Sequence, residues 1–331
     1  MCRKAMIRRC GAATTTADER GAMRSLMTRT RAAMVLLVAL AFATPALAEL
    51  RSLPVAEGIW AIVGEKGQRS AENLGNNATF GLIATEDGAV LIDAGGSYLG
   101  AEQLHAAIRA VTDLPVTLVI NTGGQDHRWL GNGYWAAQGA RIVAAEAAVE
   151  DQAARASMQL TMLSQLIGEG LAGTEPVHAS ERFADRLDLT VGGRTIEIVH
   201  AAPAHTPGDV FVWLPEERVV FTGDIVFTER LLGVLEFSSS AGWVEAFEAM
   251  AALDPLHVVP GHGDPTTLER ARADTYDYLV NLRDRMREHI DSGGDIIGSV
   301  AVDQSAFSRL EQFDMLAGRN AQQVYTEMEW E

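Results

Sequence analysis

The stretch NTGGQDHRWLGN, residues 121–132, decides how the rest of the chain is interpreted. It directly follows the apolar run VTLVI at 116–120, which predicts a buried strand, so the stretch itself predicts the turn that leaves that strand. Asp126 and His127 stand side by side in this turn, and both residue types bind metal ions in proteins. The three residues before them are Gly, Gly and Gln. The turn therefore offers two adjacent candidate ligands and no others.

Outside this turn, short apolar runs alternate with amphipathic stretches, which predicts strands covered by helices. Strands are expected at 59–65, 79–95 (a hairpin turning at 86–88), 116–121, 141–145, 195–202, 210–214, 218–224 and 256–260. Helices are expected at 101–112, 127–138, 146–169, 243–253 and 266–291. Two halves of strand and helix, with strands ending in loops rich in Gly, Asp and His, predict an α/β sandwich whose site lies along one edge.

Residues 1–48 are predicted to be a leader with a cleavable signal peptide. An arginine-rich segment precedes the apolar run at 32–43, and small residues lead to a cleavage site after Ala48. The apolar run is shorter than the roughly 20 residues that cross a bilayer. A start at an internal methionine would leave residues 1–22 untranslated. We expect a periplasmic or secreted protein with no integral membrane segment after cleavage.

The mature part, 49–331, is predicted to be one domain, because it contains neither a linker nor a repeat of fixed period. Both cysteines of the chain, Cys2 and Cys10, lie in the leader, so a metal site in the mature protein must use His and carboxylates. The net charge of −17 argues against nucleic acid as a partner. A small-molecule substrate is expected, and the oligomeric state stays open.

Four loops concentrate the candidate site residues, and each follows a predicted strand. They carry the Asp126–His127 pair, His205 in AHTPGD, Asp224 in TGD and His262 in PGHGD. A single His at a strand end is more often an ordinary hydrogen-bonding residue, and a single TGD is more often a turn. Side chains from several strand-end loops can converge, so four such loops in one chain favour a metal site.

The order of these motifs resembles that of the metallo-β-lactamase-fold hydrolases. The motifs are LIDAG (91–95), INT…DH (120–127), HTPGD (205–209), FTGD (221–224) and PGHG (260–263). The resemblance implies an αββα sandwich of two mixed sheets between helical layers, with metal ligands at the edge of the sheets. The helical insert near 146–169 and the ending at 319–331 resemble the periplasmic subgroup that includes the quinoprotein-relay zinc metallohydrolases.

Carried over onto this chain, the family pattern implies a single metal position. The family turn reads HxHxDH, whereas here the turn is one residue shorter and both leading histidines are absent. The first metal position therefore retains only His205. The second retains Asp126, His127, Asp224 and His262, which predicts about one zinc ion per chain, with iron or manganese not excluded.

The resemblance implies a mononuclear metallohydrolase that uses metal-bound water as the nucleophile on a small ester, lactam, thioester or similar bond. Asp126 and His205 are the predicted catalytic residues. If Asp224 binds loosely, Asp126 would hold the metal with His127 and His262, and His205 would act as a general base or bind the developing oxyanion.

Three alternatives remain open at this point. The chain is a non-catalytic periplasmic binding or accessory protein with a structural metal or none, or a class B-like β-lactamase, or a protein with iron-based oxidoreductase chemistry. Class B β-lactamases carry a cysteine where this chain has Asp224, which favours the broader hydrolase family.

Other notable residues are predicted to have structural roles. Asp93 is expected to hold neighbouring loops by hydrogen bonds, and Gly131 to allow a close backbone approach. The helix expected at 146–169 carries an apolar face that predicts core packing, with a lid over the pocket as the alternative. That face consists of Met158, Met162, Leu163, Leu166 and Ile167.

Overall fold

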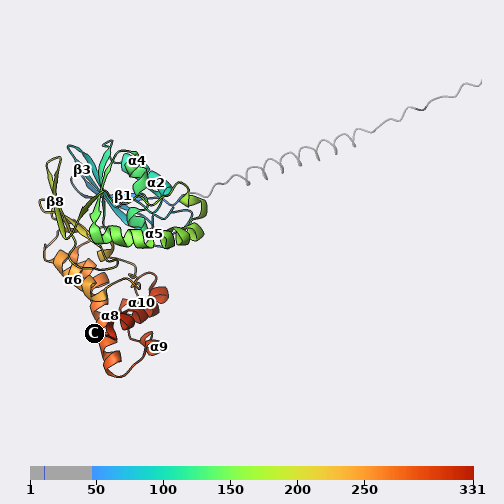
Figure 1. Ribbon diagram of the computed structural model, residues 1–331, viewed down its shortest axis with the longest axis vertical. Coiled ribbons are helices and arrows are strands. Elements are labelled where there is room, and N and C mark those ends of the chain that lie inside the picture. Colours follow the sequence, from blue (N-terminus) through green and yellow to red (C-terminus); the bar gives the residue numbers. More distant parts are fainter. Residues whose placement is uncertain (1–10, 12–46) are drawn as a thin grey trace, which may run out of the picture. The chain divides into compact units, whose positions relative to one another are not determined.

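The computed structural model describes residue 11 and residues 47–331, and the latter form one compact unit (Figure 1). Nearly all of the predicted leader, including its apolar run, lies outside the described residues. Within residues 47–331, no helix has the length and apolar content needed to cross a bilayer.

The first sheet has seven strands in the order β1-β2-β3-β4-β5-β6-β7. They are β1 (Arg51–Ala56), β2 (Ile59–Val63), β3 (Thr79–Thr85), β4 (Gly88–Ile92), β5 (Val116–Asn121), β6 (Arg141–Ala145) and β7 (Glu181–Phe183). Neighbours from β1 to β4 pair antiparallel, and neighbours from β4 to β7 pair parallel. The sheet is therefore mixed.

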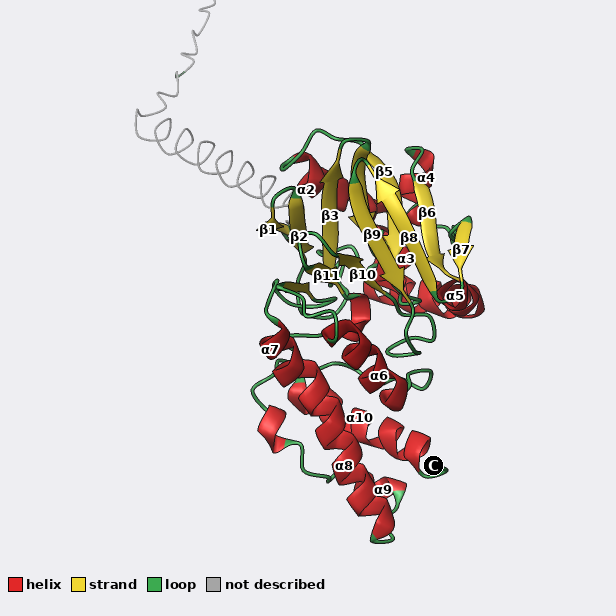
Figure 2. Cartoon of the chain, turned by 90° about the vertical axis from the view of Figure 1, so that its left-hand side faces the viewer, coloured by secondary structure: helices red, strands yellow, loops and turns green. Residues whose placement is uncertain are grey.

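The second sheet has five strands in the order β12-β11-β10-β9-β8. They are β8 (Arg186–Val191), β9 (Arg194–Val199), β10 (Phe211–Leu214), β11 (Val219–Phe221) and β12 (His257–Val259). Only β11 and β12 pair parallel; the other neighbours are antiparallel. Figure 2 shows the strands of both sheets gathered at one end of the unit, with most of the carboxyl-terminal helices beyond them.

The helices are α2 (Tyr98–Arg109), α3 (Asp126–Trp129), α4 (Asn132–Ala137), α5 (Glu146–Leu166), α6 (Ser240–Ala251), α7 (Leu268–Ala271), α8 (Asp277–Asp291), α9 (Ile296–Ser299) and α10 (Phe313–Met328). Shorter turns are η1 (Gly168–Leu171), η2 (Gly223–Ile225), the π-helical η3 (Arg272–Tyr276) and η4 (Ser305–Phe307). The helix expected at 266–291 is therefore present as α7, η3 and α8, with the π-helical turn η3 between the two α-helical parts.

Alternating side chains of β10 explain how the layers form. Val212 and Leu214 point into the core that joins the two sheets, whereas Phe211 and Trp213 belong to a second core on the outer face of the second sheet. Successive side chains of a strand point to opposite faces, so a strand that is apolar throughout must be covered on both sides. Helices α6, α8 and α10 cover this outer face, and α2 and α4 cover the first sheet. The predicted αββα sandwich is confirmed.

The predicted core face of α5 is only half correct. Leu163 and Ile167 are buried in a small cluster with Trp129, as expected. Met158 and Met162 are 50% and 37% exposed. Both methionines therefore lie outside the small buried cluster through which α5 packs.

Gly131 illustrates how closely the 121–132 turn packs on the first sheet. A Cβ atom at this position would lie 2.1 Å from the carbonyl oxygen of Ala94. The Gly131 N–H also donates a 2.9 Å hydrogen bond to the carbonyl of Gly95. The close backbone approach predicted for Gly131 is therefore present.

Replacing Gly131 with alanine should lower the free energy of unfolding by about 1–3 kcal/mol, because the added methyl group forces backbone apart in a packed region. Chemical denaturation of the purified chain measures this. The matched control is Gly133→Ala in helix α4, where a Cβ atom would lie 3.5 Å from its nearest neighbour. The control should be neutral or stabilising by up to about 1 kcal/mol. Equal effects at both positions would contradict the steric explanation.

Candidate metal centre

The 121–132 turn is held at both ends by side-chain hydrogen bonds. Asn121 and Asn132, its first and last residues, exchange amide hydrogen bonds of 3.0 and 2.8 Å. At the start of the turn, the backbone N–H and the hydroxyl of Thr122 both donate to the carboxylate of Asp93. These bonds fix the loop in a defined shape, so the residues between them project from a rigid base. The structural role predicted for Asp93 agrees with these contacts.

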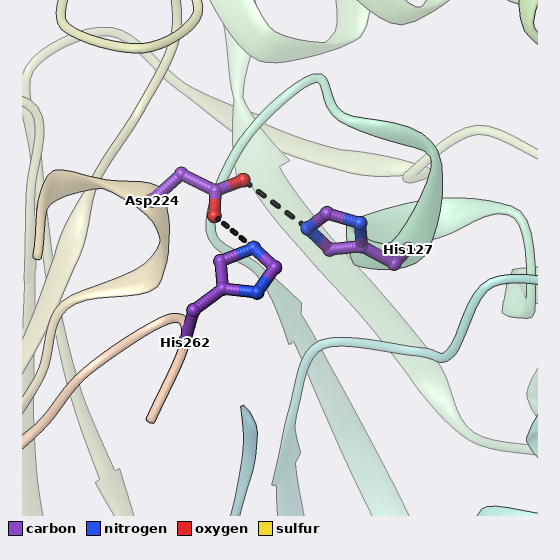
Figure 3. A group of neighbouring side chains, drawn as sticks. All are labelled: His127, Asp224 and His262. Atoms are coloured by element: carbon purple, nitrogen blue, oxygen red, sulfur yellow. Dashed lines mark hydrogen bonds and ion pairs between the residues drawn. The ribbon is translucent and has the colours of Figure 1, made fainter. Parts of the chain in front are cut away.

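Three of the predicted ligands converge in one buried cluster: His127, Asp224 and His262 (Figure 3). His127 Nε2 lies 3.3 Å from one oxygen of Asp224, and His262 Nε2 lies 3.2 Å from the other. One donor atom from each residue lies within 4.8 Å of the other two. Each residue is at most 3% exposed. The cluster therefore joins residues that are 135 positions apart in sequence.

The fold brings these residues together because their loops follow one strand of the first sheet and two neighbouring strands of the second. His127 lies in α3, just after β5; Asp224 lies in η2, after β11; and His262 follows β12. β11 and β12 are parallel, so their carboxyl ends meet at the same edge of the sheet.

Arg128 is a fully buried cation beneath the cluster. Its guanidinium donates to both oxygens of Asp224, at 3.2 and 2.7 Å, and to Asp93 at 2.8 Å. It also donates to the backbone carbonyls of Thr79 and Gly261. Burial alone would raise the pKa of Asp224, but Arg128, followed by His127, holds it well below its usual range. Asp224 is therefore a carboxylate, the form that binds metal.

Asp126, the fourth predicted ligand, is engaged differently. One oxygen of its carboxylate pairs with the guanidinium of Arg69, which also lies 3.0 Å from Nδ1 of His127. The other oxygen is buried without a hydrogen-bond partner. Burial opposes ionisation of Asp126, but the charge of Arg69 holds its pKa well below the usual range. Asp126 thus lies beside the cluster as a carboxylate whose charge an arginine already balances.

Burial keeps two histidines of the site, His262 and His205, in the neutral form. Burial, and after it the charge of Arg230, lowers the pKa of His262 well below its ordinary value. Burial also lowers the pKa of His205 to about 4. Nδ1 of His205 lies 3.0 Å from the carbonyl oxygen of Gly233, which can only accept, so Nδ1 carries the proton and Nε2 is free to accept. His205 lines the same cavity as His127 and His262.

Side chains of α5 occupy the space beside the glycines of the turn. A Cβ atom on Gly124 would lie 1.8 Å from a carboxylate oxygen of Asp151. Gln159 and Arg155 donate to the carbonyl of Gly124, and Asp151 pairs with Arg155. The position where the family motif carries a histidine is therefore filled by the polar face of a helix.

The donor set of the cluster is compatible with a metal ion. Two imidazoles and one carboxylate are ligand types that zinc accepts, and their donor atoms are within reach of one ion. A metal ion would displace the protons by which the imidazoles now contact Asp224. The unpartnered oxygen of Asp126 lies nearby and is unsatisfied as it stands.

The sequence alone did not identify Arg69 or Arg128 as part of the site. Arg128 is visible next to His127, but arginine side chains are mostly exposed, and nothing in the local pattern marks this one as buried. Arg69 lies in a loop before β3, far in sequence from Asp126. The predicted ligands were easier to identify than these arginines, because each lies in a loop that follows a predicted strand.

Comparison with known proteins identifies the family. The family model of the metallo-beta-lactamase superfamily matches residues 75–262, which is more than half of the chain. The matched segment contains His127, Asp224 and His262. The chain therefore belongs to the metallo-β-lactamase superfamily, as the order of its motifs predicted.

Similar proteins in this superfamily have different activities. The chain is 20% identical over 258 residues to the linear primary-alkylsulfatase of a Pseudomonas species, covering 64% of this chain and 47% of that protein. It thus spans about half the length of this curated relative. The metallo-beta-lactamase from Pontibacter korlensis aligns with a TM-score of 0.55 and 20% identity, over 70% of this chain and 100% of that one. The stereoselective inverting sec-alkylsulfatase from Pseudomonas sp. aligns with a TM-score of 0.66 and 15% identity, over 84% of this chain and 50% of that one. These structural likenesses show the fold.

Removing the buried cation should strongly destabilise the protein. Arg128→Met leaves the carboxylates of Asp93 and Asp224 buried without their shared partner, and we expect unfolding to become easier by about 3–5 kcal/mol. Chemical denaturation measures this loss. The control, Arg285→Met, breaks an ion pair whose side chains are 47% and 68% exposed and should change stability by less than about 1 kcal/mol. A loss at Arg128 no larger than that at Arg285 would show that the buried network adds nothing.

Proposed function

We propose that this protein is a metal-dependent hydrolase with one zinc ion held by His127, Asp224 and His262, and with Asp126 as a further ligand. The observation that carries the proposal is the convergence of two histidines and an ionised carboxylate at one buried edge of the sandwich. Membership of the superfamily supports hydrolysis as the reaction class. A bound zinc ion would supply Lewis acidity and an activated water.

The chain's own residues would position the reactants. His205 presents an unprotonated Nε2 to the cavity, since its Nδ1–H is used by the carbonyl of Gly233. This nitrogen can accept a hydrogen bond from water or take its proton, but it cannot donate to an oxyanion while it is neutral. We therefore favour the proton-accepting role for His205 over the oxyanion role. Its low pKa makes it a weak base, suited to orienting a water molecule.

The substrate class in this proposal is a small ester, lactam, thioester or similar compound. A β-lactamase role is the second enzymatic candidate, supported by the name of the similar structure from Pontibacter korlensis. The carboxylate of Asp224 at the position where class B enzymes carry cysteine argues for the broader class of hydrolases. Membership of the quinoprotein-relay subgroup stays a prediction.

An accessory role without catalysis is supported by one observation. Arg69 already contacts Asp126 and His127, so a guanidinium competes for two of the four proposed ligands. Under this alternative, the site either keeps its arginine and binds no metal, or holds a structural ion without catalysis. Measuring the metal content together with hydrolytic turnover therefore separates the two functions.

Elemental analysis of the purified chain should find about one zinc ion per molecule. His262→Ala should reduce bound zinc to near zero, because of the three ligands that remain, Asp126 is already paired with Arg69. His257→Ala, five residues earlier on β12, is the matched control and should leave the metal content unchanged. Two ions per chain would refute the mononuclear site, and a chain without zinc, iron or manganese after loading would leave the accessory role.

His205→Ala should retain the metal but slow hydrolysis on the order of a hundredfold, the range expected when a proton-transfer group is removed. Turnover would be screened over lactams, lactones, thioesters and phosphodiesters, with zinc content measured on the same samples. Unchanged turnover in His205→Ala would exclude a proton-accepting role. Loss of zinc in this variant would instead make His205 a ligand.

We also propose that the protein is exported to the periplasm or secreted, on the basis of the apolar run at 32–43 and the small residues before Ala48. Amino-terminal sequencing of the mature protein after expression in a bacterium should begin at Glu49. A mature chain that retains residues 32–43 would contradict cleavage.

A further inference from the structure

A cavity of about 280 Å³ opens beside the His127–Asp224–His262 cluster. This volume is close to the lower end for small-ligand sites. His127, His205 and His262 form part of its wall, and further wall residues come from the loop before β3, from α5, from the segment after η2 and from α10. The cavity therefore lies between the proposed metal site and the carboxyl-terminal helix.

Positive charge is concentrated in the wall of this cavity. Arg69, Arg155, Arg230 and Arg319 all line it, whereas no Asp or Glu of the described residues does. The whole chain has a net charge of −17, so a carboxylate-free wall with four arginines reverses the charge of the protein as a whole. Such a wall attracts anions.

Arg230 is a buried arginine of this wall. Its residue is 9% exposed, and within residues 47–331 it forms no ion pair. Nη1 donates to the carbonyl of Lys66 at 3.0 Å, and Nη2 donates to Gln312 at 3.3 Å. Nε is buried without a partner. Nη1 also lies 3.5 Å from Nδ1 of His262, which places this cation next to the proposed metal site.

Arginine keeps its charge in proteins at neutral pH, so the buried guanidinium of Arg230 is a cation. Asp224 and Glu311 act on it only through space, and the neighbouring Arg69 repels it. A buried charge without an ion partner is costly unless something else satisfies it.

The other arginines differ in this respect. Arg69 pairs with Asp126 and Arg155 pairs with Asp151, so their charges are largely balanced. Arg319 is exposed on α10 and forms no ion pair in the described part of the chain. Unbalanced positive charge is thus found at the inner end of the cavity, at Arg230, and again at Arg319.

Apolar side chains line the rest of the cavity. Met158 and Met162 of α5 are 50% and 37% exposed, and Met315 of α10 is 60% exposed. These three methionines line the cavity together with Leu235, Phe237 and Leu316. Methionine side chains are flexible and adapt to varied apolar ligands. Exposed apolar side chains gathered on a cavity wall are typical of a binding site.

We propose that this cavity binds an amphiphilic anion, with its acidic head group on Arg230 and its apolar tail along the methionines of α5 and α10. This inference rests on the proposed function in one respect: the cavity belongs to the proposed hydrolase site, and the inference names the class of ligand that this site binds. Charge complementarity selects the head group, and the apolar wall selects the tail. A neutral or cationic amphiphile lacks the first contact, and a bare inorganic anion lacks the second.

The binding test uses isothermal titration calorimetry of the purified chain with n-octyl sulfonate, which no ester hydrolase can cleave, below its micelle concentration. Octanoate and n-octyl phosphonate distinguish the kinds of acid head group. Octanol, octyltrimethylammonium and inorganic sulfate are the comparison ligands. We expect all three octyl acids to bind and the comparison ligands to bind at least tenfold more weakly. Shortening the tail to n-butyl should weaken binding by up to roughly fourfold per methylene. Equal binding of the cationic octyl compound would overturn the proposal.

Three variants locate the head group. Arg230→Met should weaken n-octyl sulfonate binding on the order of tenfold or more, as expected for loss of a charge-assisted hydrogen bond. Arg230→Lys should restore most of the affinity. Arg285→Met removes the same charge from the exposed side of α8 and should leave binding unchanged. Unaltered binding in Arg230→Met, or equal losses in Arg230→Met and Arg285→Met, would refute the assignment.

The titrations are repeated after zinc loading and after treatment with a chelator, so that this proposal and the hydrolase proposal fail separately. Anion binding without zinc uptake would support the cavity assignment and sink the metal-dependent function. Zinc uptake with no preference for anionic octyl compounds would support the metal-dependent function and refute the cavity assignment. If Arg230→Met fails to fold, the comparison of anionic, neutral and cationic octyl ligands on the unmodified chain still decides.

Discussion

The site depends on the buried guanidinium of Arg128. A charge without exposure to water is stable only when it is paired and hydrogen-bonded, and Arg128 meets this requirement with two carboxylates and two backbone carbonyls. Its partners come from β3, the loop after β4, the segment after β11 and the loop after β12. One side chain thus joins the edges of both sheets. It also keeps Asp224 ionised and oriented toward His127 and His262, so the same contacts that stabilise the sandwich prepare the candidate ligands.

Arginines also explain how a shortened family motif is accommodated. Where family members place the second histidine of the motif, this chain has Gly124, and the Asp151–Arg155 pair of α5 fills the space. At the second metal position, the positive charge of Arg69 balances the negative charge of Asp126. Losing histidine ligands without such changes would leave buried carboxylates and carbonyls unsatisfied, at a cost of about 1–3 kcal/mol for each group. The helix α5 and the loop before β3 therefore complete the electrostatics of the site.

The ligand cluster could be predicted from the sequence because its residues follow apolar strands in loops whose local pattern is visible. His127, Asp224 and His262 each stand within a few residues of a strand end, and parallel strands bring such ends together. The arginines could not be predicted in the same way. Arg69 approaches Asp126 from a loop 57 residues earlier, and the burial of Arg128 depends on contacts with four separate segments. Met158 and Met162 line a cavity together with residues of α10, a helix that the periodicity had not indicated.

The acidic surface and the basic cavity have a common physical consequence. A net charge of −17 repels anions at long range, but at 0.15 M salt this repulsion decays over about 8 Å. Among the arginines of the cavity wall, Arg230 and Arg319 have no carboxylate paired with them in the described part of the chain, and a low-dielectric wall strengthens their attraction for an anion. A zinc ion on His127, Asp224 and His262 would add further positive charge beside Arg230. Anion binding and metal binding should therefore reinforce each other: a bound acid offsets the repulsion between the metal and the guanidinium, and each ligand should raise the affinity for the other.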